Sequence, residues 1–544
     1  MPSKFYVPKP DWDVPQKSRN ELIELGLERG KAILSRQIDH LTLEYESQRS
    51  NPNLQKLHGF LQSNQLLVKP TDKNLGISLI SKSWYIGQCE KLLATGDYSR
   101  LLHISDVQYE QEYVLQHIEI YLIQHPSFSL GEYLSLSRDE TGIPTFHGIP
   151  KVHKKVWSMR PIVPSHSWVT KRASEIVDVS LRAFHRRHYP WVVDSTRQVI
   201  QMMDKKTIVR GPRIWVVTGD VESFYTNVNV FETIDQIHRL FADEPPINGV
   251  NRDLLRQLLR LVMNCNCFEF NGKFYRQVRG TAMGTSCAPS FANLSIAFIE
   301  KRFPSIIDSV TAQDGLILYA RYIDDILSIF SGSRQELDAL LARFDKHFWP
   351  FKITWQVHDQ FQPAAFLDIE IYFEQNFGPI GVQTRVYRKK LNRHQYIPWS
   401  SAHPLHVKKA FFKAELTRYM TICSQRKDFE EKVRSFMESL LKRGYPLDIL
   451  RSWKTQVNYL DRALTLSKCK EDSIRNTPLM IHSSYNAIWE HIDLRSVFLE
   501  MRQTWAPLED SLPPALKSSL IKSLRRTDNL FDKFSVWNKD LLKE

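Results

Sequence analysis

Three aspartates with apolar neighbours have the side-chain type and spacing needed to hold divalent cations. Asp220 follows the apolar run 215–217, and Asp324 and Asp325 interrupt the apolar stretch LILYARYIDDILSIF. Carboxylates in such surroundings are costly unless a cation neutralises them, and Mg²⁺ prefers carboxylate oxygens. Two Mg²⁺ ions about 3.5–4 Å apart, or Mn²⁺ in their place, can activate a hydroxyl nucleophile and stabilise a leaving pyrophosphate. The alternative, a solvated Asp-Asp turn, fits these apolar flanks poorly.

Strands, and helices that cover them, are expected to position these carboxylates. A hairpin that turns at residues 322–325 would place Asp324 and Asp325 at one strand junction, and Asp220 would end another strand. The alternating segment FLDIEIYF predicts a half-buried strand. Apolar residues at three- and four-residue spacing predict helices at about 17–68, 105–135, 230–241, 252–263 and beyond 405.

The composition narrows the class of protein. A chain of 544 residues suggests two to four lobes. It has no window of about eighteen apolar residues, so no membrane partner is expected, and its polar start lacks a signal-peptide core. Six cysteines without a CxxC pair favour a reducing compartment. Lys and Arg number 73 against 60 for Asp and Glu, and this surplus of 13 favours a polyanionic partner.

Short motifs around the aspartates resemble those of reverse transcriptases. YIDD resembles the YxDD box, and GDVESFYTNV resembles the first palm motif, in which an aromatic residue follows the aspartate by five positions. RGTAMGTSCAPSFANL resembles the second palm motif in the GTxMGSxxAPxxAN form of Penelope-like retroelements. KPTDKNLG and HGIPKVHKKVWSMRPIV resemble that family's KPADKG and GxPKxHKxxxxxRPIV motifs in the fingers. The ordered set covers roughly residues 60–535, which makes the resemblance specific.

The resemblance implies a role for each matching residue of the metal site. Asp220 and Asp324 would be direct metal ligands, with Asp325 as a supporting ligand. The backbone carbonyl of Val221 would complete the site. Tyr225 matches the steric gate beneath the nucleotide sugar, and its alternative role is that of an ordinary core aromatic residue.

The resemblance also implies substrate-binding residues. Besides Tyr225, the positions matching nucleotide contacts are Lys73, Lys151, Arg160, Met283 and Gly284. The positions matching template or primer contacts are Gly280, Pro289, Asn293 and Tyr322. For a lone basic residue the alternative is a solvated surface position, and for the glycines it is a Gly-rich entry to a helix. Asp368 and Glu370 in FLDIEI are interpreted as structural.

The fold that the resemblance implies is α+β, a right-handed polymerase with fingers, an antiparallel-sheet palm and a helical thumb. We expect a helical N-terminal extension at 1–59, fingers at 60–205, a catalytic palm at 206–378, and a thumb with a C-terminal helical region at 379–544. We also expect the form of the family without a GIY-YIG endonuclease domain, because ten residues after Phe534 cannot hold one.

The implied function is that of an RNA-directed DNA polymerase of retroelement origin, which extends a primer 3′-hydroxyl on an RNA template. Its partners would be an RNA template, a DNA primer or duplex and deoxynucleotides, and its expected location is the nucleus. Two alternatives within the polymerase class are a telomerase-like enzyme with a dedicated RNA and a domesticated polymerase. A third alternative is a catalytically silent relative that only binds nucleic acid, although the intact aspartates argue against it.

Overall fold

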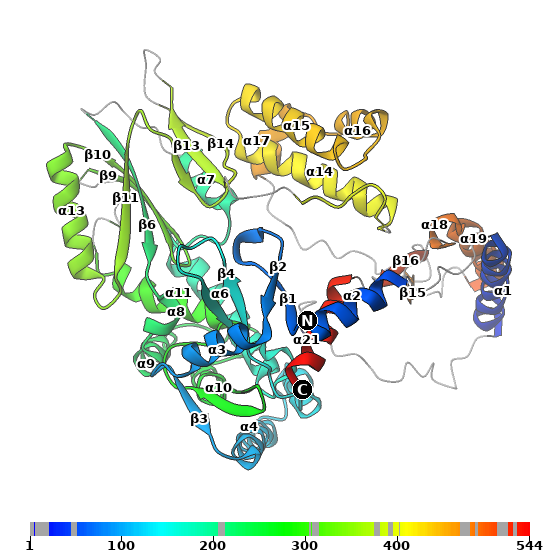
Figure 1. The fold of residues 1–544 in the computed structure, drawn as a ribbon, viewed down its shortest axis with the longest axis horizontal. Helices are drawn as coiled ribbons and strands as arrows, with labels where there is room; N and C mark the ends of the chain where they lie inside the picture. Colours follow the sequence, from blue (N-terminus) through cyan, green and yellow to red (C-terminus); the bar gives the residue numbers. More distant parts are fainter. Residues whose placement is uncertain are drawn as a thin grey trace.

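The structure, a computed structural model, describes most of the chain (Figure 1). The described residues are 5, 21–44, 52–204, 213–303, 306, 315–374, 381–389, 395–401, 403–467, 479–484, 488–508, 520–525 and 530–543. The structure describes five of the six cysteines, and all five are buried. Cys469 lies outside the described residues.

A four-stranded antiparallel sheet lies at the centre of the described chain, with strand order β11–β6–β10–β9. The strands are β6 (Ile214–Val221), β9 (Leu316–Tyr322), β10 (Asp325–Ser331) and β11 (Ile353–Asp359). Successive side chains of a strand point to opposite faces. On β6, Trp215 and Val217 therefore enter one hydrophobic core, whereas Ile214 and Val216 enter another. Because both faces are covered, the strand sequences are apolar over most of their length.

Helices surround the first of these cores. They include α6 (Lys171–His188), α9 (Val230–Leu240), α10 (Arg252–Asn264), α11 (Ala288–Glu300) and α13 (Arg334–His347). Side-chain caps fix where three of them begin, since Asn229 and Asn251 each accept a backbone N–H of the first turn and Ser333 forms a capping box with Glu336. The helices predicted at 230–241 and 252–263 are confirmed.

Two hairpins precede the central strands in the chain, and a small sheet joins one strand from before β6 to two strands that follow it. The first hairpin pairs β1 (Leu66–Pro70) with β2 (Ile77–Ser81), and the second pairs β4 (His147–Lys151) with β5 (Ser158–Ile162). The small sheet has the order β3–β8–β7, from β3 (Tyr98–Leu101), β7 (Cys267–Phe270) and β8 (Lys273–Gln277). Helices α3 (Lys82–Leu93), α4 (Ile104–Gln124) and α5 (Gly131–Ser135) complete this part, so helix at 105–135 is confirmed.

The second core joins the other face of the central sheet to a sheet and a helical bundle. Its strands are β12 (Ala364–Phe366), β13 (Ile369–Phe373) and β14 (Val382–Val386). Its helices are α7 (Thr196–Asp204), α14 (Leu405–Ile422), α15 (Arg426–Leu441), α16 (Leu447–Lys454) and α17 (Arg462–Ser467). The strand predicted for FLDIEIYF is confirmed at Ile369–Phe373. It does not include the start of the segment, because Leu367 has a φ of 52° and turns the chain from β12 into β13.

The two ends of the chain pack against each other and against the first hairpin (Figure 1). Helix α1 (Glu21–Glu44) lies on α19 (Leu494–Trp505), and α21 (Leu530–Lys543) lies beside α2 (Pro52–Ser63) and β1. Strands β15 (Leu479–Ser484) and β16 (Leu520–Arg525) pair in parallel, so the uniformly helical pattern expected beyond 405 is wrong there.

Close packing explains why α1 contains small residues on its inner face. A side chain at Gly26 would meet the indole of Trp505, with the nearest atom 2.3 Å from an added Cβ. At the other end, Asn538 of α21 accepts the backbone N–H of Val68 at 3.0 Å and donates to its carbonyl at 2.6 Å. This side chain therefore occupies the hydrogen-bonding edge of β1 as a neighbouring strand would.

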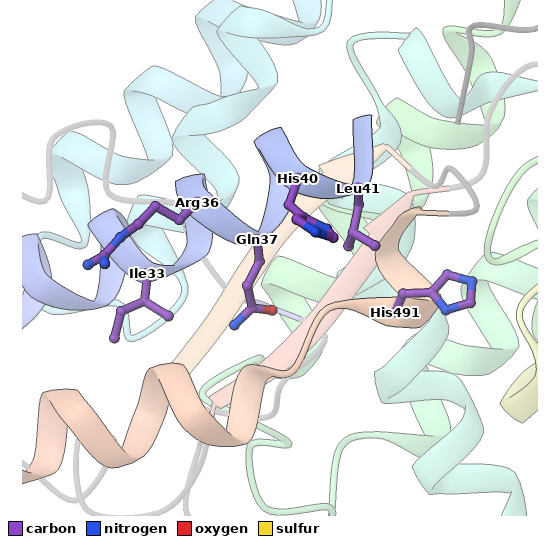
Figure 2. A pocket seen from close by; sticks show the side chains of 6 residues that line it. All are labelled: Ile33, Arg36, Gln37, His40, Leu41 and His491. Atoms are coloured by element: carbon purple, nitrogen blue, oxygen red, sulfur yellow. The ribbon is translucent and has the colours of Figure 1, made fainter. Parts of the chain in front are cut away.

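A cavity of about 410 Å³ lies between α1 and α18 (Ile488–His491), and Figure 2 shows its lining side chains. The lining residues include Arg36, Gln37, His40 and His491 but no carboxylate. The side-chain amide of Gln37 donates to the backbone carbonyl of Asp493 and accepts the Asp493 N–H, so Gln37 holds α1 against that segment. This cavity therefore offers no acidic metal site.

Within the described residues, no helix is both long and apolar enough to cross a membrane.

Candidate active site

The strand register brings the predicted carboxylates to one end of the central sheet. Asp325, the first residue of β10, is directly opposite Asp220 on β6 and Tyr322 on β9. Directly opposed residues of antiparallel strands have side chains on the same face. Asp324 lies in the turn between β9 and β10, where its carbonyl accepts the backbone N–H of Val221 at 3.0 Å. The turn of one hairpin is thereby attached to the end of β6.

A buried arginine supports this turn from inside the protein. Arg321 and Glu300 have 0% exposed side chains and form an ion pair, with Nε 2.6 Å from Oε1. The guanidinium also donates at 2.8 Å to the carbonyl of Ile323, whose φ of 56° is unusual for a β-branched residue. Trp191 and Tyr319 donate to Glu300 at 2.8 and 2.6 Å. Glu300 ends α11, so this ion pair connects that helix to the aspartate turn.

Burial and mutual repulsion disfavour the charged forms of the turn carboxylates. The pKa of Asp325 is raised to about 6, first by burial and then by the charges of Asp324 and Asp220. The pKa of Asp324 is also raised, again first by burial, while Arg160 and Arg321 oppose the rise. A cation placed between these oxygens would relieve both effects. The donor set, which consists of hard carboxylate oxygens, fits Mg²⁺.

The side chains are not already arranged as a closed metal cage. Among the described residues, no group of three or more His, Cys, Asp and Glu side chains is placed so that it could hold an ion without adjustment. Asp220 is exposed, and Asp324 and Asp325 are half-buried. The site is therefore open on one side, as a site that receives a substrate must be.

Tyr225 lies beside the aspartate turn, as its five-residue offset from Asp220 predicts. After β6 the chain turns at Ser223, whose φ is 51°, into the short helix α8 (Phe224–Asn227). Tyr225 is half-buried, and its pKa is raised to about 12, first by burial and then by the charges of Asp324 and Tyr322. The charge of the Asp324 carboxylate therefore acts on the Tyr225 hydroxyl. Its ring also packs against the first core. Tyr225 therefore serves in part as a core aromatic residue, which was its alternative role.

The glycines of the second palm motif are required by close backbone contacts within the protein. A Cβ at Gly280, whose φ is 69°, would lie 2.2 Å from the carbonyl oxygen of Tyr225. A Cβ at Gly284, whose φ is 123°, would lie 2.2 Å from the carbonyl oxygen of Val163. The carbonyl of Met283 accepts the Val163 N–H at 2.8 Å. The motif thus connects the chain after Asp220 to the chain after the β4–β5 hairpin.

Basic side chains of the two hairpins gather within electrostatic reach of the aspartates. The pKa of Lys151 is lowered, first by burial and then by Arg160 and Lys154, with a smaller contribution from Lys73. Arg160 forms an ion pair with Asp72, Nε to Oδ1 3.3 Å, and its charge also acts on Asp324. The charges of Arg160 and Lys73 therefore both act on Lys151. Asp72, their acidic neighbour, was not predicted as a site residue.

A cavity of about 740 Å³ lies on the other side of the turn, between the hairpin and α14. Tyr322 and Asp325 line it from the hairpin, and Lys389 and Arg418 supply positive charge. Asp368 also lines the cavity and is held by Arg418 at 2.6 Å and by Thr196. Glu370 pairs with Arg385. These contacts agree with the structural role expected for both acidic residues.

Two residues predicted to contact template or primer are integrated into the protein interior. Asn293 is buried in α11. The Arg321 guanidinium donates to its side-chain oxygen at 2.8 Å and to its backbone carbonyl at 2.9 Å. Pro289 stands in the first turn of the same helix and is half-buried. Backbone N–H groups in the first turn of a helix have no acceptor within the helix. Proline, which lacks this N–H, therefore loses no hydrogen bond at this position. Both residues lie in the helix that ends at Glu300.

Comparison with known protein families decides what this arrangement is. Residues 149–354 match the reverse transcriptase (RNA-dependent DNA polymerase) family, and this range contains all three aspartates. The protein therefore contains a reverse transcriptase domain. Residues 395–455 match the animal helix-turn-helix domain, and they contain α14, α15 and α16. A comparison with curated proteins found no match.

The chain is similar to solved telomerase structures, of which the first shows the polymerase fold. The telomerase of Candida albicans, solved with a fragment of telomeric RNA, is 9% identical with a TM-score of 0.51, over 85% of this chain and 74% of that one. The apo telomerase of Candida tropicalis is 10% identical with a TM-score of 0.42, over 96% and 82% of the two chains. The predicted α+β polymerase fold is confirmed, and the enzyme is an RNA-dependent DNA polymerase.

Sequence reasoning missed the residues that support the reverse transcriptase domain from within. Arg321 is a single basic residue in the apolar strand LILYARY, and Glu300 ends the apolar segment SIAFIE. Charged residues are seldom fully buried unless they are paired. The signal that the sequence offered for a buried ion pair was therefore two charges of opposite sign, each isolated in an apolar segment. Their pairing, however, depends on the contact of α11 with β9 and could not be read from either segment alone.

Proposed function

We propose that the protein extends a primer 3′-hydroxyl on an RNA template by two-metal-ion nucleotidyl transfer, with Asp220, Asp324 and Asp325 as the catalytic carboxylates. The register that sets Asp325 opposite Asp220, with Asp324 attached to Val221, is the observation that carries this assignment. Asp220 and Asp324 would be the direct ligands of two Mg²⁺ ions, Asp325 would support them, and the Val221 carbonyl would complete the set. When bound, the ions would activate the 3′-hydroxyl and stabilise the leaving pyrophosphate.

The protein's own side chains bind and orient the reactants in this scheme. Lys73, Lys151 and Arg160 receive the triphosphate, for which a planar guanidinium and point-charge ammonium groups are suited. Asp72 holds the Arg160 guanidinium between the hairpins before a nucleotide arrives. Met283 and Gly284, at the contact with Val163, would lie beside the incoming nucleotide. The adjoining cavity, lined by Tyr322 and Lys389, would receive the primer end.

The helix that follows the second palm motif has a supporting role in this proposal. Gly280 lets the chain pass close to Tyr225, and Pro289 begins α11. Asn293 is engaged by Arg321, so we assign it to holding the aspartate turn rather than to touching template or primer. We divide the chain as expected into fingers (60–205), palm (206–378) and thumb (379–544). The range 379–544 also holds the C-terminal helical region, in which α19 packs against α1, and α21 packs against α2 and β1.

Primer extension on an RNA template tests the function directly. With Mg²⁺ and deoxynucleotides, the purified protein should extend a DNA primer to the template end, and EDTA should stop the reaction. Mn²⁺ should restore extension, because it accepts the same oxygen ligands. A protein that binds the primer–template but extends it with neither ion would be a silent relative, and the proposed function would then be rejected.

Tyr225 should determine which sugar the enzyme accepts. Its hydroxyl is within the electrostatic influence of Asp324, and its ring would fill the space of a ribonucleotide 2′-hydroxyl. Tyr225→Phe keeps the ring and should keep the preference for deoxynucleotides. Tyr225→Ala removes the ring and should lower the ratio of kcat/KM for dNTP over rNTP by at least tenfold, about 1.4 kcal/mol. An unchanged ratio in Tyr225→Ala would mean that Tyr225 serves only as a core aromatic.

The subtype that we propose is a Penelope-like retroelement polymerase that works in the nucleus. The segment RGTAMGTSCAPSFANL, with Met283 at the position where other reverse transcriptases carry glutamine, supports this subtype. A telomerase-like enzyme is the second candidate, favoured by the extent of the fold similarity to a telomerase. A requirement for one particular co-purifying RNA as template would favour the second candidate, and free use of added RNA templates would favour the first.

A further inference from the structure

We propose that α4 is a self-association surface, through which two copies of the protein pair by a parallel two-helix seam. Helix α4 (Ile104–Gln124) lies at the edge of the molecule (Figure 1) and packs inward through Val107, Val114 and Ile118. Its outward face carries large apolar side chains, with exposed fractions of 68% for Tyr109, 53% for Ile120 and 73% for Ile123. This inference is independent of the catalytic proposal.

The spacing of the exposed apolar residues is that of a coiled-coil seam. Tyr109, Tyr113, Ile120 and Ile123 stand four, seven and three residues apart, and the exposed Gln116 fills the gap between the second and third. Steps of four and three residues repeat every seven, which is the pattern that pairs two helices. We call these five side chains the α4 stripe. A polar residue within such a seam costs stability but fixes its register, and Gln116 would do so here.

The α4 stripe faces away from the body of the protein. At 3.6 residues per turn its centre lies about 150° around the helix from the buried side chains. Two copies joined through their stripes would therefore have their bodies on opposite sides of the seam. A two-fold axis along paired parallel helices would relate the copies, and such a closed interface is the usual form of a homodimer.

The charges on α4 argue against nucleic acid as the occupant of the stripe. The helix carries four acidic residues, Asp106, Glu110, Glu112 and Glu119, and no Lys or Arg, although the whole chain has a net charge of +13. Glu110 and Glu119 form ion pairs with Arg276 and Arg138 of neighbouring segments, so Asp106 and Glu112 supply the remaining negative charge. A nucleic-acid surface needs basic side chains to neutralise phosphates. The acidic helix would instead lower the repulsion between two basic copies of the protein.

The residues that flank the stripe select the parallel pairing. Glu112 and Glu119 lie along one side of it, and His117 and Gln124 lie along the other. In a parallel pair, a residue on the first side faces the residue five positions later on the second side of the other copy. Glu112 would then face His117, and Glu119 would face Gln124. An antiparallel pair would set glutamate against glutamate.

His117 is oriented by its own helix for such a contact. Its ring lies 4.0 Å from that of Tyr113, and its Nδ1 is 2.8 Å from the Tyr113 carbonyl, to which it would donate. The Nε2 atom then faces outward as the group that meets Glu112 of the second copy. An interface of one helix per copy is small against the roughly 1,600 Å² of a standard interface, so we expect a weak, micromolar dimer.

Sedimentation velocity on the full chain at about 1 to 100 µM tests the proposal. The wild type should shift from monomer to dimer as concentration rises, and Ile120→Glu with Ile123→Glu should stay monomeric over the whole range. Gln108→Glu, an exposed change on the same helix outside the stripe, should dimerise like the wild type. Circular dichroism would show that each variant is folded. A wild type that stays monomeric, or a double variant that still dimerises through another surface, would overturn the proposal.

Disulfide trapping tests the direction of the seam. In a Cys469→Ser background, Tyr109→Cys and Ile123→Cys should each form a covalent homodimer under mild oxidation, whereas a mixture of the two should give little 109–123 product. Predominant 109–123 trapping would overturn the parallel seam. Primer–template affinity should not change in Ile120→Glu with Ile123→Glu. A loss of affinity without a change in oligomeric state would assign the stripe to nucleic acid and overturn self-association.

Discussion

Replacing Asp220 or Asp324 by asparagine should reduce primer extension by roughly a thousandfold or more. Metal ions stabilise the developing charge of the transition state by several kcal/mol, and each 1.36 kcal/mol corresponds to a factor of ten in rate. Asparagine keeps the side-chain shape but removes the charge that holds the ions. Asp325→Asn should be damaging to a smaller degree, since we assign Asp325 a supporting position.

The same substitutions should leave folding and nucleic-acid binding intact. Burial and neighbouring carboxylates raise the pKa values of Asp324 and Asp325, so their charged forms destabilise the folded state above those pKa values. Loss of one charge relieves that strain, and the thermal unfolding midpoint should stay level or rise at pH 7. Primer–template binding in an electrophoretic shift assay should also remain near that of the wild type, or tighten because repulsion is lost.

A surface substitution provides the matched control for the aspartate variants. Asp243→Asn removes one carboxylate from an exposed position outside the described site and should leave extension unchanged. Near-normal extension by Asp220→Asn or Asp324→Asn would refute the assignment of the catalytic carboxylates. Loss of both extension and binding would instead indicate a folding defect, which the thermal unfolding midpoint would reveal.

Arg321→Met should be among the most destabilising single substitutions in the reverse transcriptase domain. It would leave Glu300 charged, fully buried and without its cation, and breaking a buried ion pair in this way costs about 3–5 kcal/mol. Adding Glu300→Gln removes the stranded charge while keeping an acceptor for Trp191 and Tyr319, so the double variant should recover part of the loss. The midpoint of thermal or urea unfolding measures both effects.

An exposed ion pair supplies the comparison for Arg321. Arg334 and Asp338 stand one helical turn apart on α13, with side chains 52% and 54% exposed. Such pairs contribute only about 0.3–0.5 kcal/mol. Asp338→Asn, which removes the pair but keeps the Arg334 guanidinium over the Trp215 ring, should therefore scarcely move the unfolding midpoint. If Arg321→Met were equally mild, the buried network could not be what holds the aspartate turn.

The catalytic carboxylates were predictable because their signal is local. Asp220 and the Asp324-Asp325 pair interrupt short apolar strands, and that interruption is visible in a window of about fifteen residues. The hairpin between β9 and β10 follows from the same pattern. The pairing of β6 with β10 is long-range. Its register is nevertheless constrained, because each strand has a carboxylate at one end and is buried on both faces.

Long-range contacts were not predictable from the sequence. The ion pair of Asp72 with Arg160 joins two hairpins, and the parallel strands β15 and β16 pair across about forty residues. Neither pairing leaves a periodic pattern in either segment. The break at Leu367 was missed for a different reason, since the alternation of FLDIEIYF continues across a turn that a left-handed residue produces. Tertiary packing decides such positions.

The attachment of Asn538 to β1 has a consequence for how the protein is made. Val68 and Asn538 are separated by 470 positions in the chain, and ribosomes add about 5–20 residues per second. The outer edge of β1 therefore stays uncovered for on the order of half a minute or longer, until Asn538 has been synthesised. During that interval the nascent chain presents an unpaired strand edge, which is a template for pairing with other chains. Helix α21 thus covers, 470 residues later in synthesis, a strand edge that is prone to pair with other chains.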